Sequence, residues 1–141
     1  MIRPVNSEQA AYAKWITSAA VHAGQVLVLG TDNVAPAAEG VSTAIIVGVA
    51  VEDTASGGIV SVYDAKQEFE FDIYQGDTVD EGTEAMYGLD YDLYVDGAVD
   101  DDGGEGEMYI DLNDTGMIRL TSYDNNRRVA TGKFVDALIY I

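Results

Sequence analysis

The densest group of possible metal ligands in the sequence is the acidic run between residues 96 and 107. Its main candidates are Asp100, Asp102 and Glu105, which lie among several glycines. Calcium favours several carboxylate oxygens on a flexible loop, so this run offers the chemistry of a calcium site. The spacing nevertheless fails the EF-hand pattern, because Ala98 stands where a ligand is needed. We therefore predict a solvated hairpin loop, with a Ca²⁺-dependent binding or adhesion module as the alternative function.

Few residues in this chain could support nucleophilic catalysis. His22 is the single histidine, no Gly-x-Ser-x-Gly elbow is present and cysteine is absent, so neither a serine–histidine pair nor a thiolate is expected. The sequence also lacks a Walker A motif and a Gly-x-Gly-x-x-Gly motif, which argues against a phosphate cradle. Carboxylates are numerous enough to form a glycosidase-like pair by chance, and a glycan-processing enzyme is a third hypothesis. We predict that the protein is not an enzyme, with no catalytic residue and no cofactor.

Side chains suited to protein interfaces lie near both ends of the chain. Aromatic residues and arginine are enriched at binding hot spots, and these residue types single out a candidate set. The candidates are Arg3, Tyr12, Trp15, Ile16, Arg119, Arg127 and Arg128. The sequence does not place them on a common surface.

The composition limits the kind of partner. The chain has 141 residues, with seven Lys plus Arg against 25 Asp plus Glu, and a formal net charge of −18. Such an acidic surface repels phosphate backbones, so nucleic-acid binding is not expected. No apolar run approaches the length of a membrane span, and no basic segment precedes an apolar stretch at the N-terminus, so neither a membrane helix nor a secretory signal is expected. Hydrophobic residues make up 48% of the chain, which is enough for one packed core.

The elements that must position these residues are short strands separated by glycine-rich turns. Phe69, Phe71 and Ile73 alternate with polar residues, a period of two that is typical of a strand with one buried face. Further strand-like runs cover residues 25–29, 43–51, 59–63, 89–96, 107–112, 117–123, 127–131 and 134–141. This pattern predicts a mostly β fold, a small antiparallel β-barrel or sandwich.

The N-terminal segment has a different composition. Residues 1–14 are predicted to form an N-terminal arm or a short alanine-rich helix capped by Ser7, ahead of a single β domain over 15–141. Trp15 is expected to plug one end of the barrel. The alternative is an extended arm that reaches a neighbouring subunit, since termini are mobile unless they are docked.

Three further segments give local expectations. Residues 75–86 lack a strand pattern and are predicted to form a long surface loop between two β lobes. The apolar run 134–141 is predicted to be a strand that closes the barrel, because it is too apolar for an open edge. Asp90, Asp92 and Asp96 are expected to share the solvated face of one strand.

The opening strands share a pattern with a known family. The residues are WITSAAVHAGQVLVLG at 15–30, VGVAVED at 47–53 and GGIVSV at 57–62. In this order they resemble the small head decoration (cement) proteins of tailed bacteriophages. Residues 109–129 are similar to the last hairpins of such barrels, whereas the acidic region 75–106 departs from the pattern.

The resemblance implies a non-catalytic structural protein on the outer surface of the virion. Such a protein binds the assembled capsid, bridges neighbouring subunits of the major capsid protein and stabilises the head. A homo-oligomer, trimer or dimer, is implied as well. No cofactor, nucleic acid or membrane enters this function, and the candidate interface residues would form the docking surface.

Overall fold

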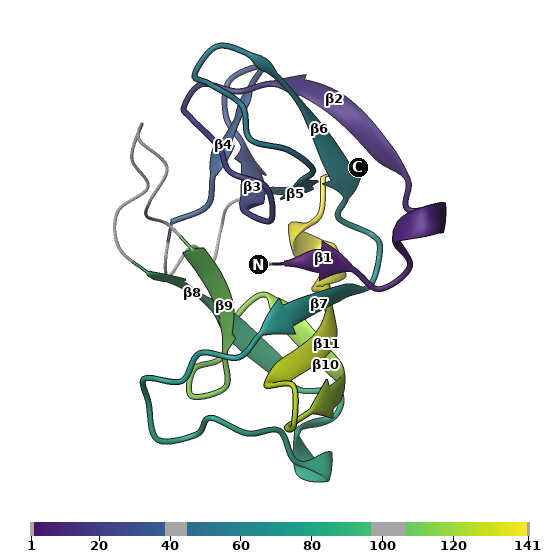
Figure 1. Ribbon diagram of the computed structural model, residues 1–141, viewed down its shortest axis with the longest axis vertical. Coiled ribbons are helices and arrows are strands. Elements are labelled where there is room, and N and C mark those ends of the chain that lie inside the picture. Colours follow the sequence, from purple (N-terminus) through teal and green to yellow (C-terminus); the bar gives the residue numbers. More distant parts are fainter. Residues whose placement is uncertain (1, 39–44, 97–106, 141) are drawn as a thin grey trace.

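The computed structural model describes residues 2–38, 45–96 and 107–140, and its fold is mostly β (Figure 1). Strands hold 48% of the residues and helical turns 7%, in two antiparallel sheets of which one is curled into a half-barrel. Figure 1 shows the five-stranded sheet in the upper half of the molecule and the six-stranded sheet in the lower half. The predicted fold class, a small antiparallel barrel or sandwich, is confirmed.

The six-stranded sheet combines the N-terminal strand with the second half of the chain. In spatial order its strands are β1 (Arg3–Pro4), β7 (Phe69–Asp72), β11 (Val129–Phe134), β10 (Ile118–Asp124), β8 (Asp90–Asp96) and β9 (Glu107–Asp111). The sheet curls far enough that Ile73, just past β7, forms a bridge with Ile110 on β9.

The core of this sheet follows from the alternation seen in the sequence. Phe69, Phe71 and Ile73 are all buried, and Phe134 from β11 packs on the first two with ring centroids 5.6 and 5.8 Å away. Burying such a side chain is worth about 1.5–3 kcal/mol, so this group anchors the curled sheet.

The five-stranded sheet is built from the first half of the chain. In spatial order its strands are β2 (Tyr12–Ile16), β6 (Ile59–Asp64), β5 (Ile46–Ala50), β3 (Val26–Leu29) and β4 (Val34–Pro36). The central strand β5 is buried along its whole length. Gly48 is required there because a Cβ atom would overlap the carbonyl oxygen of Tyr63 on β6.

The N-terminal segment belongs to both sheets. The predicted helix capped by Ser7 is wrong in extent, since the only helical turn is the three-residue 3₁₀ turn η1 (Ser7–Gln9) with Asn6 at its N-cap position and no capping bond. The chain then enters β2, which pairs with β6 in antiparallel register. A helix of this length is marginal alone, and pairing with a formed sheet outweighs the preference of alanine for helix.

Two other segments differ from the expectation. The predicted strand 134–141 is wrong for its described residues after Phe134: β11 ends there, the 3₁₀ turn η3 (Asp136–Leu138) follows, and Ile139 bridges Ile46 of the five-stranded sheet. Residues 75–83 contain no strand and lead through η2 (Glu84–Met86) to β8, so the segment 75–86 connects two strands of the same sheet and not two lobes.

The acidic strand β8 confirms the alternation and corrects one detail. Tyr91, Leu93 and Val95 are buried, and the aspartates between them face outward. Asp96 is exposed as expected, but Asp92 is half-buried against the turn that follows β9, so this part of the face is not fully solvated. Within the parts of the chain that the structure describes, no helix is long and apolar enough to cross a membrane.

Candidate functional site

The open edge of the five-stranded sheet is the most exposed apolar feature that the predicted residues form. Strand β2 lies at this edge and pairs along its length with β6, and four of its five residues are exposed. Just past the strand, Thr17 forms a bridge with Val34 of β4, so the open part of the edge ends at Ile16. Tyr12 is 64% exposed and Ile16 54%, and Ile59, the cross-strand partner of Ile16, is 64% exposed. These three side chains share the outer face because directly opposed residues point to the same side of a sheet. We call β2 together with Ile59 the edge site.

Part of the backbone of the edge site has no hydrogen-bond partner among residues 2–38, 45–96 and 107–140. The Asp64 N–H donates to the Ala11 carbonyl (2.9 Å), and the Thr17 N–H donates to the Gly58 carbonyl (3.0 Å). The main-chain N–H and C=O groups of the odd-numbered residues of β2 therefore point toward β6. In an antiparallel pair the residues between them direct their N–H and C=O groups away from the partner. The main-chain groups of Tyr12 and Lys14 therefore point outward, where another strand could pair with them.

Trp15 serves the fold and not the outer face of the edge site. Its side chain lies on the inner face of β2, half-buried against a cluster of buried residues that includes Val60 and Val62. Its ring packs edge to face on the ring of Tyr140, with the centroids 5.3 Å apart. This contact ties the C-terminal segment to the five-stranded sheet. It explains why the strand is held in place although most of its side chains are exposed. That Trp15 plugs one end of the barrel stays a prediction.

Two of the predicted arginines meet at one carboxylate. The Arg3 Nε and the Arg127 Nη2 each lie 2.8 Å from the Glu70 Oε1 on the outer face of the six-stranded sheet. Burial raises the pKa of Glu70, but the hydrogen bonds from Arg127 and Arg3 outweigh this effect and leave the pKa below its ordinary value. Both cations are thus neutralised within the molecule.

The remaining predicted arginines are also engaged. Arg119 donates through Nε and Nη2 to the two carboxylate oxygens of Asp90, at 2.9 and 3.2 Å. Arg128 donates to the side-chain oxygen of Gln75. The interface set therefore divides between the edge site and the opposite sheet, and its arginines do not form a free cationic patch.

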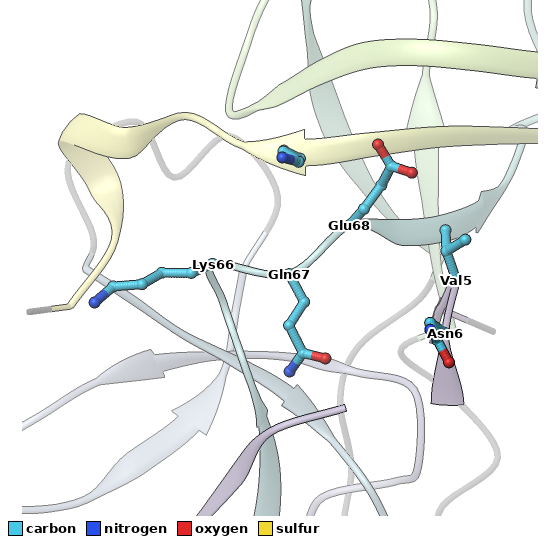
Figure 2. A pocket seen from close by; sticks show the side chains of 6 residues that line it. Val5, Asn6, Lys66, Gln67 and Glu68 are labelled. Carbon is cyan, nitrogen blue, oxygen red and sulfur yellow. The ribbon is translucent and has the colours of Figure 1, made fainter. Parts of the chain in front are cut away.

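A shallow cavity of about 420 Å³ lies where the chain crosses between the two sheets (Figure 2). It is lined by Val5, Asn6, Lys66, Gln67, Glu68 and Lys133. Figure 2 shows Lys66 reaching away from Val5 and Asn6. Small-molecule sites are mostly apolar and enclosed, whereas this cavity is open, five of its six lining residues are polar or charged, and it holds no nucleophile beside a base. The cavity gives no support to a catalytic function.

His22 does not form a catalytic arrangement. Its Nδ1 lies 3.6 Å from the Asp53 Oδ1, while its buried Nε2 has no hydrogen-bond partner in the described part of the chain. A nucleophile would be needed at Nε2 for a serine–histidine mechanism. The same Asp53 oxygen accepts the Ala23 N–H at 2.8 Å, which fits a structural role for this turn.

The calcium candidates Asp100, Asp102 and Glu105 lie outside the described residues. Among residues 2–38, 45–96 and 107–140, no group of three or more acidic or histidine side chains is arranged to hold a metal ion. The calcium alternative thus gains no supporting observation.

Sequence reasoning missed Ile59 as a member of the edge site. The alternation of strand β6 could have identified it. Ile59 lies on the same face of the strand as Ser61 and Tyr63, whereas Val60 and Val62 lie on the opposite face and are buried. What the sequence does not give is the pairing of this strand with β2, which joins residues more than forty positions apart.

No protein-family model matches the chain, and no curated protein is similar to it at a significant level. The likeness to phage decoration proteins therefore remains a prediction from the sequence.

Proposed function

We propose that the protein is a non-catalytic structural protein that binds the outer surface of an assembled viral capsid and bridges neighbouring major capsid subunits. The observation that carries the proposal is the edge site, an edge strand that pairs with β6 on one side and, with Ile59 of β6, exposes Tyr12, Ile16 and Ile59 on a rigid β scaffold. Natural proteins usually protect such edges with charges, prolines or bulges. Here one charge, Lys14, stands at the centre of the strand while the other four residues are apolar or aromatic, so the edge is only partly protected and can accept a partner.

The proposed contact is strand addition. An extended segment of a capsid subunit pairs with the outward main-chain groups of Tyr12 and Lys14, and its side chains pack on Ile16 and Ile59. Each contact is modest, but a copy or oligomer that touches two or three subunits gains affinity through effective concentration. A dimer or trimer of this chain would provide such multiple contacts.

The charge of the molecule agrees with this role. A net charge of −18 keeps the outward faces soluble and steers the protein toward basic patches on a shell. The protein needs no cofactor and no nucleic acid for this function.

Co-sedimentation with capsids from the source virus tests the proposal. Deleting the N-terminus would remove β1 and β2 from their sheets, so a point substitution is the sharper tool. Lys14→Pro removes an N–H group that points outward and leaves the pairing with β6 intact, whereas Lys14→Ala removes the same charge and keeps the N–H. We expect saturable binding by the natural protein and by Lys14→Ala, and loss of most binding by Lys14→Pro.

Two results would contradict the proposal at different levels. Undiminished binding by a folded Lys14→Pro variant would move the contact away from the edge site and keep the capsid function. Absence of saturable binding by the natural protein at every salt concentration would remove the capsid function itself.

A further inference from the structure

Three tyrosines form a cluster on the outer face of the six-stranded sheet, at the seam where the curled sheet meets itself. The rings of Tyr74 and Tyr94 are stacked, with centroids 3.7 Å apart and planes inclined by 19°. Tyr109 lies against both, with centroids 6.2 and 6.4 Å away. All three are half-buried, so part of each ring faces solvent.

The backbone fixes this cluster. Tyr94 on β8 and Tyr109 on β9 are direct cross-strand partners, and the Tyr74 N–H donates to the Ile110 carbonyl at 3.0 Å. The neighbouring Leu93 and Ile110 are fully buried, so alternation turns the tyrosines outward. Because Tyr94 and Tyr109 stand on paired strands and the backbone of Tyr74, just past β7, is hydrogen-bonded to β9, the three rings form a preorganised surface.

Carboxylates surround the tyrosine cluster. The Tyr109 hydroxyl donates to the Glu107 Oε2 at 2.8 Å, and Asp96 is the cross-strand partner of Glu107 at the ends of the same two strands. The hydrogen bond to Glu107, burial, and the negative charges of Glu107, Asp96 and Asp72 raise the pKa of Tyr109 to about 12. All three carboxylates thus lie close enough to act on one hydroxyl group.

The negative charge of this surface is only partly compensated. Asp72 lies 3.6 Å from the Arg3 guanidinium, and no ion pair to Glu107 or Asp96 is present among the residues that the structure describes. Aromatic faces attract cations through the ring quadrupole, and carboxylates accept hydrogen bonds from the same cation. The surface therefore combines the two features that select a cationic side chain.

We propose that the tyrosine cluster, with Glu107 and Asp96 at its rim, binds an arginine side chain on an exposed segment of another protein. The planar guanidinium lies along the tyrosine rings while its N–H groups donate to the rim carboxylates, an arrangement that suits arginine better than lysine. A neutral sugar ring would stack on the tyrosines and donate its hydroxyl groups to the carboxylates, but it would leave the negative charge of the rim uncompensated. The inference concerns a surface distinct from the edge site and does not require the partner to be a capsid.

Binding of a fluorescent hexa-arginine peptide, measured by anisotropy at physiological salt, tests the tyrosines. Tyr94→Leu keeps an apolar side chain and removes the aromatic face. The matched control is Tyr87→Leu, which removes an exposed tyrosine that packs on Tyr123 at 5.7 Å outside the cluster. We expect Tyr94→Leu to weaken binding about fivefold and Tyr87→Leu to leave it unchanged.

A second pair of variants separates local recognition from the attraction of any cation to an acidic protein. Glu107→Gln and Glu84→Gln change the net charge equally, but Glu84 lies on η2, away from the cluster. We expect only Glu107→Gln to weaken binding markedly. Equal effects of the two substitutions, or of the two tyrosine variants, would overturn the proposal in favour of unspecific charge attraction. Competition by a neutral glucose oligomer would overturn it in favour of a sugar platform.

Discussion

Glu70 on β7 links its neighbouring strand β1 to the turn between β10 and β11 through single side chains. Arg3 from β1 and Arg127 from the turn between β10 and β11 both donate to it, over sequence separations of 67 and 57 residues. The arginines were predicted to be docking residues because of their type. Their carboxylate partners are distant in sequence, so residue type alone does not reveal that these cations are already paired.

Glu70→Gln should lower stability at neutral pH by about 1–2 kcal/mol, because it weakens two charge-assisted hydrogen bonds. The pKa of Glu70 lies below its ordinary value, so its contribution is present above the unfolded-state pKa and is lost as pH falls through the folded-state pKa. Urea unfolding at neutral and at acidic pH measures this. We expect the difference in the free energy of unfolding between the variant and the natural protein to shrink in acid. A difference that stays constant with pH would contradict a stabilising role of the ionised Glu70.

The pKa of Asp92 is shifted in the opposite direction to that of Glu70. Burial raises its pKa, and the charges of Asp114 and Asp111 add to the effect despite a hydrogen bond from the Leu93 N–H. The ionised group therefore costs stability above the unfolded-state pKa, and this cost disappears as pH falls through the raised folded-state pKa. Asp92→Asn should raise the melting temperature at neutral pH and change it little in acid. A lower melting temperature at neutral pH would show that the carboxylate is needed for the turn.

At the scale of elements, the alternating strands were predictable and the ends of the chain were not. Phe69 and Phe71 show one buried face directly in the sequence, because the side-chain period of a strand is two. Residues 10–13 have helical composition, yet Tyr12 and Ala13 lie in β2 because they pair with β6, a contact that local propensity does not contain. The C-terminal run is apolar because Ile139 is buried beside β5, and not because it forms a strand.

Strand β5 gives the test at this scale. Gly48→Ala should destabilise the protein by about 2–4 kcal/mol, because the new Cβ would overlap the Tyr63 carbonyl oxygen and force the two strands apart. Gly57→Ala is the control: its surroundings are empty, so only its positive φ of 82° opposes a side chain and the cost should be about 1 kcal/mol. Chemical denaturation measures the free energy of unfolding of both variants. Similar losses of stability would contradict the close approach of Gly48 to the Tyr63 carbonyl.

At the scale of the whole molecule, the composition predicted a single acidic β protein but not how its sheets are assembled. The order of strands in the six-stranded sheet places β1 beside β7 and β11 beside β7, pairings between residues more than fifty positions apart. Alternation shows which face of a strand is buried, and it does not show which strand lies next to it. For the same reason the sequence identified Tyr12 and Ile16 of the edge site but neither Ile59 nor the tyrosine cluster.

The net charge of −18 makes a prediction for the folded state as a whole. Repulsion among the carboxylates strains the compact form, and salt screens it, with a Debye length of about 8 Å at physiological ionic strength. The melting temperature should therefore rise as sodium chloride is added from low to high concentration. A melting temperature that is flat or falls over this range would show that the internal ion pairs of Glu70 and Asp90 outweigh the overall repulsion.

Hydrogen exchange of the natural protein, free and bound to capsids from the source virus, tests the central claim most directly. If a capsid segment adds to the edge site, the amide protons of Tyr12 and Lys14, which point outward in the free protein, become protected on binding. We expect slowed exchange in peptides that cover β2, with little change over the cavity at the sheet junction. Saturable binding with unchanged exchange in β2 would contradict the account and place the contact elsewhere on the molecule.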